Sequence, residues 1–155
     1  MSLDAIDLRI LEKLQDDASI TQRQLAESLH ISPATALRRV QQLKQRGIIE
    51  REVAILNPQV MGSYLQVIAE VTLDKQDSHS QDGFEEAIKT VSAVQQCYRV
   101  SAGPDFILVM IVPNMQGYQT LAREIFIAQY NVRNVRAFFC TQRVKFSTQI
   151  PILPG

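Results

Sequence analysis

Between residues 38 and 51 the sequence holds five basic side chains and a single acid, Glu50. Arginine pairs with guanine edges in the major groove of DNA, and basic or amide side chains donate hydrogen bonds to phosphates. Short side chains just before this stretch could approach base edges closely. These residue types predict a surface for duplex DNA, with Ser32, Ala34, Thr35 and Arg38 at the bases and Arg39, Gln42, Lys44, Arg46 and Arg51 at the phosphates.

A second candidate site is the turn at residues 101–105, which is rich in small residues. Such a turn exposes backbone N–H groups that can hold a carboxylate, and the Asp105 carboxylate can pair with an ammonium group. Together these groups suit a zwitterionic amino acid. The same residues also suit an ordinary turn between two strands, so both interpretations stay open.

The predicted DNA-binding residues need a rigid support, and the first 50 residues show the pattern of three short helices. Thr21 and Gln24 are spaced as a capping box, and Ser32 is a good N-cap for the helix that follows. Gly47 is suited to end that third helix. His30 stands in the turn before it, where φ is commonly positive, a conformation that histidine tolerates better than β-branched residues do. The pattern predicts a helix-turn-helix whose second helix carries the basic residues.

From residue 65 onward the pattern changes to strands and helices in the order β-α-β-β-α-β. This order packs as a four-stranded antiparallel sheet with both helices on one face, a ferredoxin-like arrangement that makes the whole chain α+β. The other sheet face is too apolar for water, which predicts that a second copy covers it in a two-fold dimer. The expected strands are 65–73, 94–101, 106–112 and 135–146, and the expected helices are 82–91 and 115–125.

The composition bounds the class of protein. Hydrophobic residues make up 46% and charged residues 21% of the chain, as in globular proteins, so the chain is expected to fold. The formal net charge is zero, so DNA binding has to depend on the local basic stretch. Asn57, Pro58 and Gly62 mark a boundary, which gives a DNA-binding domain at 1–56, a linker at 57–62 and a dimerisation and ligand-sensing domain at 63–155.

Several features argue against other locations and chemistries. No apolar run is long enough to span a bilayer and the first residues are not a leader, so a cytoplasmic protein without membrane contact is expected. Cys97 and Cys140 lie in predicted strands without a nearby histidine, which favours buried, reduced thiols over metal ligands. The sequence has no phosphate-binding glycine loop and no nucleophile motif, so neither an enzyme nor a cofactor is expected.

These motifs together resemble one family, the leucine-responsive/asparagine-synthetase (Lrp/AsnC) transcription regulators. The resemblance covers essentially the whole chain and rests on Leu3-Asp4 with Asp7 and Ile10-Leu11, Ser32-Pro33 with Leu37-Arg38-Arg39-Val40 and Leu43, Gly47-Ile48-Ile49, Asn57-Pro58, Val112-Pro113 with Met115 and Tyr118, and Val144-Lys145.

This resemblance implies a fold, a function and an assembly. The fold is a winged helix-turn-helix followed by a ligand-binding βαββαβ domain that dimerises, with dimers often assembling into octamers. The function is sequence-specific regulation of transcription in response to an amino acid or a related effector. In the family the effector lies near the turn at 101–105, between dimers, and by position this implies Ser101, Ala102, Gly103, Asp105, Met115, Phe138, Phe139 and Thr141.

Two other classes of function compete with this interpretation. Small βαββαβ domains also serve as amino-acid-binding regulatory subunits of metabolic enzymes, and a protein interaction module is the second alternative. An interaction module would leave the basic third helix without a purpose. Salt-dependent binding to random duplex DNA separates them, because phosphate contacts weaken as salt rises.

Overall fold

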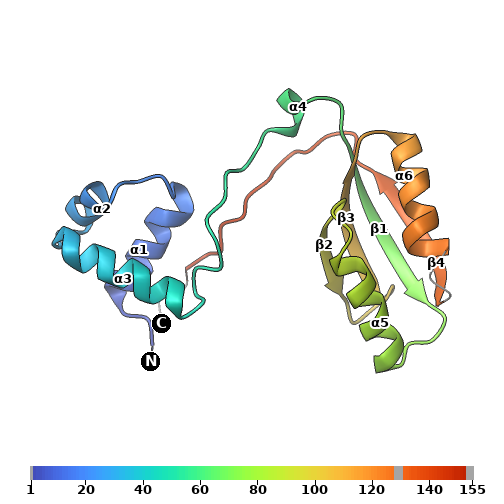
Figure 1. The fold of residues 1–155 in the computed structure, drawn as a ribbon, viewed down its shortest axis with the longest axis horizontal. Helices are drawn as coiled ribbons and strands as arrows, with labels where there is room; N and C mark the ends of the chain where they lie inside the picture. The colour runs from blue at the N-terminus through green and yellow to red at the C-terminus, as the bar shows by residue number, and fades with distance from the viewer. Residues whose placement is uncertain (1, 128–130, 153–155) are drawn as a thin grey trace. The chain divides into compact units, whose positions relative to one another are not determined.

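The structure, a computed structural model, describes residues 2–127 and 131–152. The chain divides into two compact units (Figure 1). Each unit has its own hydrophobic core. The first unit holds the described residues of Met1–Ile55 and Lys145–Gly155, and the second holds Leu56–Val144. The sequence assigned residues 63–155 to one domain, whereas the described residues after Val144 group with the N-terminal unit, to whose first helix Gln149 and Ile150 hydrogen-bond.

Three helices form the first unit: α1 (Ala5–Asp16), α2 (Gln22–Leu29) and α3 (Pro33–Gln45). The predicted caps are present. Thr21 and Gln24 form the capping box of α2, with Gln24 N–H donating to Thr21 Oγ1 over 3.2 Å, and Ser32 caps α3 with Pro33 in its first turn. The apolar faces of the helices meet in a core of Ile10, Leu25, Ala26, Leu29, Ala36 and Leu43.

The second unit is built on a four-stranded antiparallel sheet in the order β2-β3-β1-β4. Its strands are β1 (Leu65–Leu73), β2 (Val94–Arg99), β3 (Phe106–Val112) and β4 (Val132–Phe139). In β1 and β3 every second residue is buried, because one sheet face packs on helices and the other does not. The predicted α+β class and the antiparallel sheet are confirmed.

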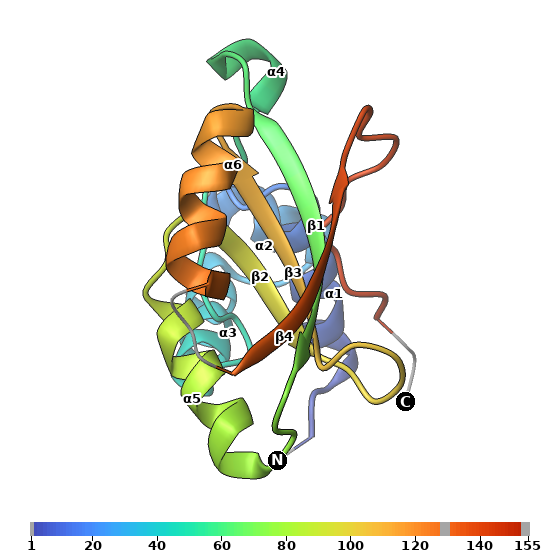
Figure 2. The same cartoon turned by 90° about the vertical axis from the view of Figure 1, so that its right-hand side faces the viewer.

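Helices α5 (Ser78–Lys89) and α6 (Met115–Ala122) lie on the same side of the sheet (Figure 2). A wider π-helical turn, Arg123–Ile127, continues α6. Alternate side chains of β1 and β3 pack under these helices, and the rings of Phe84 and Phe106 lie 4.8 Å apart at their centroids. The opposite sheet face carries no helix in the described part of the chain.

Some predicted boundaries differ from the structure. Helix α5 begins four residues before the predicted start at 82, because Asp77 caps it by accepting the Ser80 N–H at 2.9 Å. Strand β4 spans Val132–Phe139 and not 135–146, and the predicted linker contains a one-turn helix, α4 (Pro58–Met61). Residues 51–57, between α3 and α4, belong to neither a helix nor a strand.

The two cysteines are free thiols, each half-buried. Cys97 lies within β2 and Cys140 directly follows β4, where its N–H donates to the Gln66 carbonyl over 2.9 Å. Burial raises the pKa of the Cys97 thiol. A raised pKa favours the protonated thiol over the reactive thiolate.

Candidate nucleic-acid interface and effector site

The turn between α2 and α3 sets how α3 is presented. His30 adopts the predicted left-handed conformation, with φ of 54°, and the Ile31 N–H donates to the Ala26 carbonyl over 3.0 Å. Ala26 is fully buried, which lets the two helices approach closely. The turn thus fixes α3 relative to α2 through backbone geometry and close packing.

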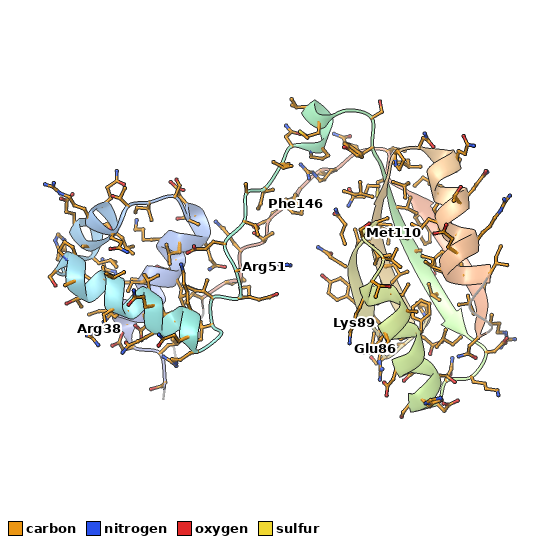
Figure 3. All side chains as sticks on the ribbon, viewed as in Figure 1. Arg38, Arg51, Glu86, Lys89, Met110 and Phe146 are labelled. Atoms are coloured by element: carbon orange, nitrogen blue, oxygen red, sulfur yellow. The ribbon has the colours of Figure 1, made fainter. Side chains whose placement is uncertain are left out.

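The outer surface of α3 carries the residues predicted to meet base edges. Ser32, Ala34 and Arg38 are exposed and Thr35 is half-buried. The Ser32 hydroxyl accepts the Thr35 N–H over 3.2 Å and lies 2.8 Å from the Thr35 hydroxyl, so both hydroxyls have fixed positions in the cap. Arg38, labelled in Figure 3, has no ion-pair partner in the described chain and is available to a ligand.

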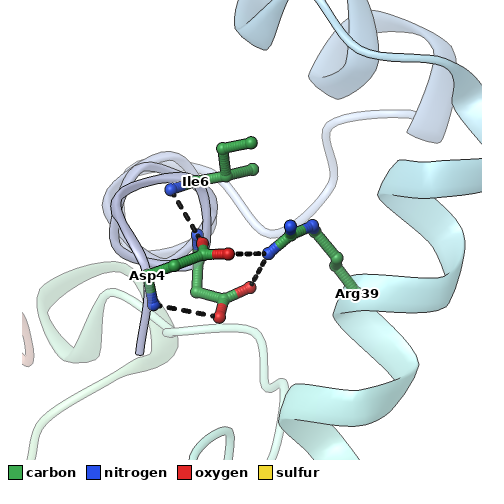
Figure 4. Close-up of polar contacts among 4 residues, drawn as sticks. Asp4, Ile6 and Arg39 are labelled. Carbon is green, nitrogen blue, oxygen red and sulfur yellow. Dashed lines mark hydrogen bonds and ion pairs between the residues drawn. The ribbon is translucent and has the colours of Figure 1, made fainter. Parts of the chain in front are cut away.

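Arg39 has a different environment from its neighbour Arg38. Its Nη1 donates to Asp4 Oδ2 and to Asp7 Oδ1, both over 2.7 Å (Figure 4). The Arg39 side chain is only 19% exposed and the Asp7 side chain 12%. The Arg39 guanidinium thus ties α3 to the start of α1, and its predicted contact with a phosphate stays a prediction that competes with these two ion pairs.

The same carboxylates also cap α1. Asp4 Oδ1 accepts the Asp7 N–H at 2.9 Å and the Ile6 N–H at 3.0 Å, while Asp7 Oδ2 accepts the Asp4 N–H at 3.3 Å. The Asp7 N–H, and then the Arg39 guanidinium, lower the pKa of the Asp4 carboxyl. The two carboxylates in turn raise the pKa of Arg39. One capping box and one arginine thus fix the first and third helices to each other.

The other predicted phosphate contacts differ in how free they are. Gln42 is exposed. The side chain of Arg51, labelled in Figure 3, is 75% exposed, and its nearest acid is Glu50 at 4.0 Å. Lys44 Nζ lies 3.0 Å from Glu52 Oε2, so part of its charge is already balanced. The basic character of the surface therefore depends mainly on Arg38 and Arg51, with Arg46 exposed nearby in sequence.

The predicted effector turn at 101–105 is exposed at residues 101–103 but not at Asp105. Asp105 is 7% exposed, and its Oδ2 accepts the Leu73 N–H over 2.7 Å and the Gln76 side-chain N–H over 3.2 Å. These bonds fasten the turn to the end of β1. Asp105 thus has a structural role, which the sequence had left open as the alternative to ammonium binding.

The other predicted effector residues lie at the opposite end of the sheet from this turn. Phe106, next to the turn, pairs with Val71, whereas Phe139 pairs with Val67. Four residues of strand separate these pairs by about 13 Å. A single protomer therefore does not bring the two groups together: the first is Ser101, Ala102, Gly103 and Asp105, and the second is Met115, Phe138, Phe139 and Thr141.

The second group is itself divided by the sheet. Phe139 is on the helix-covered side, where its ring meets that of Tyr118 edge-on at 5.1 Å. Phe138 is on the open face, with the Arg136 guanidinium 5.3 Å from its ring centroid. Met115 is 46% exposed at the start of α6. Met115 and Phe139 thus share one side of the sheet, and Phe138 lies on the other.

One cleft of the second unit, of about 400 Å³, lies between α5 and β2 and contains none of the predicted effector residues. Its charged lining is largely self-paired, because Arg99 bridges Asp82 at 2.9 Å and Glu85 at 2.7 Å. Among the described residues, no three His, Cys, Asp or Glu side chains are grouped to hold a metal ion. None of the described helices has the length and apolar character needed to cross a membrane.

Two family models match the chain. Residues 3–50 match a winged helix-turn-helix DNA-binding domain, and residues 66–150 match the Lrp/AsnC ligand binding domain. The two matches together span both compact units.

Curated relatives match over nearly the full length. The chain is 34% identical to an HTH-type transcriptional regulator of Haemophilus influenzae over 96% of its own length and 89% of that protein. It is 32% identical to the leucine-responsive regulatory protein of Escherichia coli K12, over 97% and 92% of the two chains.

Solved structures agree with the fold. An AsnC family transcriptional regulator from Agrobacterium tumefaciens superposes with a TM-score of 0.88 at 27% identity, covering 96% of this chain and 97% of that one. A Neisseria meningitidis transcriptional regulator in complex with L-Met also gives a TM-score of 0.88, at 24% identity and 97% coverage of both chains.

Proposed function

The chain belongs to the Lrp/AsnC family of transcription regulators, and we propose that it reads duplex DNA through the outer surface of α3 and responds to an amino acid or a related small molecule. Its relatives are regulators, and the family is not enzymatic. The observation that carries the proposal is the exposed, capped start of α3 with Arg38 on it, which has no ion-pair partner among the described residues. We propose that the protein acts in the cytoplasm, where a DNA-binding regulator meets its operator.

We propose a smaller set of DNA contacts than the sequence predicted. Ser32, Ala34, Thr35 and Arg38 face base edges, and Arg38 is the residue that reads a guanine. Gln42, Arg46 and Arg51 contact phosphates, and Lys44 does so in competition with Glu52. Arg39 leaves the set because its guanidinium is bound within the protein.

An Arg38→Ala variant tests this arrangement. We expect the affinity for a duplex selected from random sequence to fall by about 1 to 3 kcal/mol and the preference at one base pair to relax. Arg23→Ala is the matched control, because Arg23 is exposed on α2 and pairs with Glu27 at 3.0 Å. Fluorescence anisotropy at several salt concentrations measures both. Unchanged affinity and preference in Arg38→Ala would mean that α3 is presented differently.

We propose that the open sheet face pairs two copies of the chain. Ile68 on β1 lies between Val109 on β3 and Phe138 on β4 in this face. Beside this apolar row, Arg136 and Glu70 form an ion pair at 3.2 Å. An apolar row of this kind is stabilised by a second apolar surface, and the same face of another copy supplies one.

We further propose that the effector binds where one copy's turn at 101–105 approaches another copy's Met115 and Phe139. The separation of these groups across the sheet supports a site shared between copies, as does the exposure of Met115 and of residues 101–103. Backbone N–H groups of the turn would hold the carboxylate of an amino acid. Calorimetry with each of the twenty amino acids, repeated with Phe139→Ala, tests this, and an undiminished heat of binding in the variant would contradict the proposal.

A further inference from the structure

The C-terminal segment makes a specific contact with α1. The side-chain amide of Gln15 forms two hydrogen bonds with the backbone of Ile150: its Nε2 donates to the Ile150 carbonyl over 3.1 Å, and its Oε1 accepts the Ile150 N–H over 2.6 Å. One side chain thus satisfies both backbone groups of a residue 135 positions away in sequence. This two-bond pattern matches the pairing of adjacent strands and specifies one register.

Gln149 adds a second anchor beside the first. Its Nε2 donates to Asp16 Oδ1 over 2.8 Å and lies 3.4 Å from the Gln15 carbonyl oxygen. That carbonyl belongs to the last turn of α1, where backbone acceptors lack helical partners. The Gln149 N–H donates to Ser147 Oγ over 3.2 Å, which shapes the segment for docking. The contact therefore completes the end of α1.

The docked segment continues directly from the sheet of the second unit. Strand β4 ends at Phe139, and the chain re-enters the first unit at Lys145. The first unit is therefore linked to the second by two covalent connections, one after Ile55 and one after Val144. A second tether lowers the freedom of the linked unit without any new contact between the units.

We propose that residues 145–152 are a strap that joins α1 of the DNA-binding unit to β4 and limits the motion of that unit. Because β4 carries Phe138 and Phe139, a change at that strand reaches α1 through the strap as well as through the chain after Ile55. The docking itself stands on the Gln15 and Gln149 contacts alone. Its regulatory meaning rests on the proposed function.

Backbone hydrogen exchange tests the docking in the full-length protein. In the wild type, we expect the Ile150 amide to be protected, and in Gln15→Ala to exchange at least about tenfold faster, because its acceptor is gone. Gln22→Ala is the control, an exposed glutamine of the same unit whose side chain has no hydrogen bond with the described residues. Equal exchange at Ile150 in the wild type and in Gln15→Ala would overturn the proposal.

A second measurement tests the strap as a restraint on motion. The probe is a duplex selected by the wild type, with its two half-sites moved apart by half a turn or by a whole turn of DNA. For each protein, the affinity for the half-turn probe is divided by the affinity for the whole-turn probe. We expect this ratio to be at least about threefold higher in Gln15→Ala than in the wild type. An equal ratio in both proteins would overturn the restraint. Absence of DNA binding by the wild type would instead refute the proposed function and leave the exchange result unaffected.

Discussion

Replacing Arg39 by alanine should lower the stability of the DNA-binding unit without removing a DNA contact. Arg39 joins α3 to α1 through one nitrogen that donates to two carboxylates. In Arg39→Ala the Asp7 carboxylate keeps its buried position and loses its cation. A buried charge without a partner is costly, so the folded state is weakened more than the loss of a surface ion pair would suggest.

The size of the effect follows from the exposure of each partner. Asp4 is 53% exposed, and exposed pairs contribute little, about 0 to 1 kcal/mol. Asp7 is 12% exposed and Arg39 19%, close to the buried limit, for which removal of one partner costs about 3 to 5 kcal/mol. We therefore expect Arg39→Ala to lower the free energy of unfolding of the first unit by about 2 to 3 kcal/mol.

Denaturant-dependent hydrogen exchange of amides in α1, α2 and α3 measures this free energy within the intact chain. Arg23→Ala removes an ion pair whose side chains are 84% and 66% exposed, and should change the free energy by less than about 0.5 kcal/mol. If Arg39 contacted a phosphate instead, its removal would leave the unit equally stable. It would also reduce the slope of log affinity for DNA against log salt concentration by about one. That pair of results would refute the assignment of Arg39 to the protein interior.

Three further expectations follow from other contacts. Val109→Asp should leave the protein monomeric in analytical ultracentrifugation, while Gln95→Asp, on an exposed residue of β2, should keep the wild-type assembly; a dimeric Val109→Asp would exclude the open sheet face. Because folding lowers the pKa of Asp4 from 3.8, its contribution to the free energy of unfolding should be fully present above that pH and be lost as the pH falls below it. Asp4→Asn should flatten this part of the curve of unfolding free energy against pH. Asp105→Ala should lower the melting temperature by removing the acceptor of the Leu73 N–H, at a cost of about 1 to 3 kcal/mol; full stability with loss of amino-acid binding would return Asp105 to the effector site.

Local chemistry made some of the fold predictable from sequence. Thr21 and Ser32 predict the starts of α2 and α3, because a capping side chain bonds to backbone groups within one turn of itself. The start of α5 was missed because its first six residues, before Phe84, are polar and show no helical period. The end of β4 was missed for a different reason: the apolar pattern continues to Phe146, but the chain leaves β1 after the Cys140 N–H bonds to Gln66. Strand ends depend on partners that lie elsewhere in the sequence.

The adjacent residues Arg38 and Arg39 show which part of a side chain's environment can be predicted from sequence. Arg38 and Arg39 have identical chemistry, yet one faces outward and the other is tied to α1. The helical period contained this distinction, because Arg39 lies three residues after buried Ala36 and four before buried Leu43. Its acceptors could not be inferred in the same way, since Asp4 and Asp7 lie 35 and 32 positions away in the sequence.

The placement of the turn at 101–105 and of Phe139 at opposite ends of one sheet has a consequence for solution behaviour. If each small molecule has to touch two copies, mass action ties its occupancy to the concentration of the protein itself. Dilution would then release the small molecule, and adding the small molecule would oppose dissociation of the copies by an equal free energy. The concentration of small molecule needed to occupy the site would thus depend on how much of the regulator the cell makes.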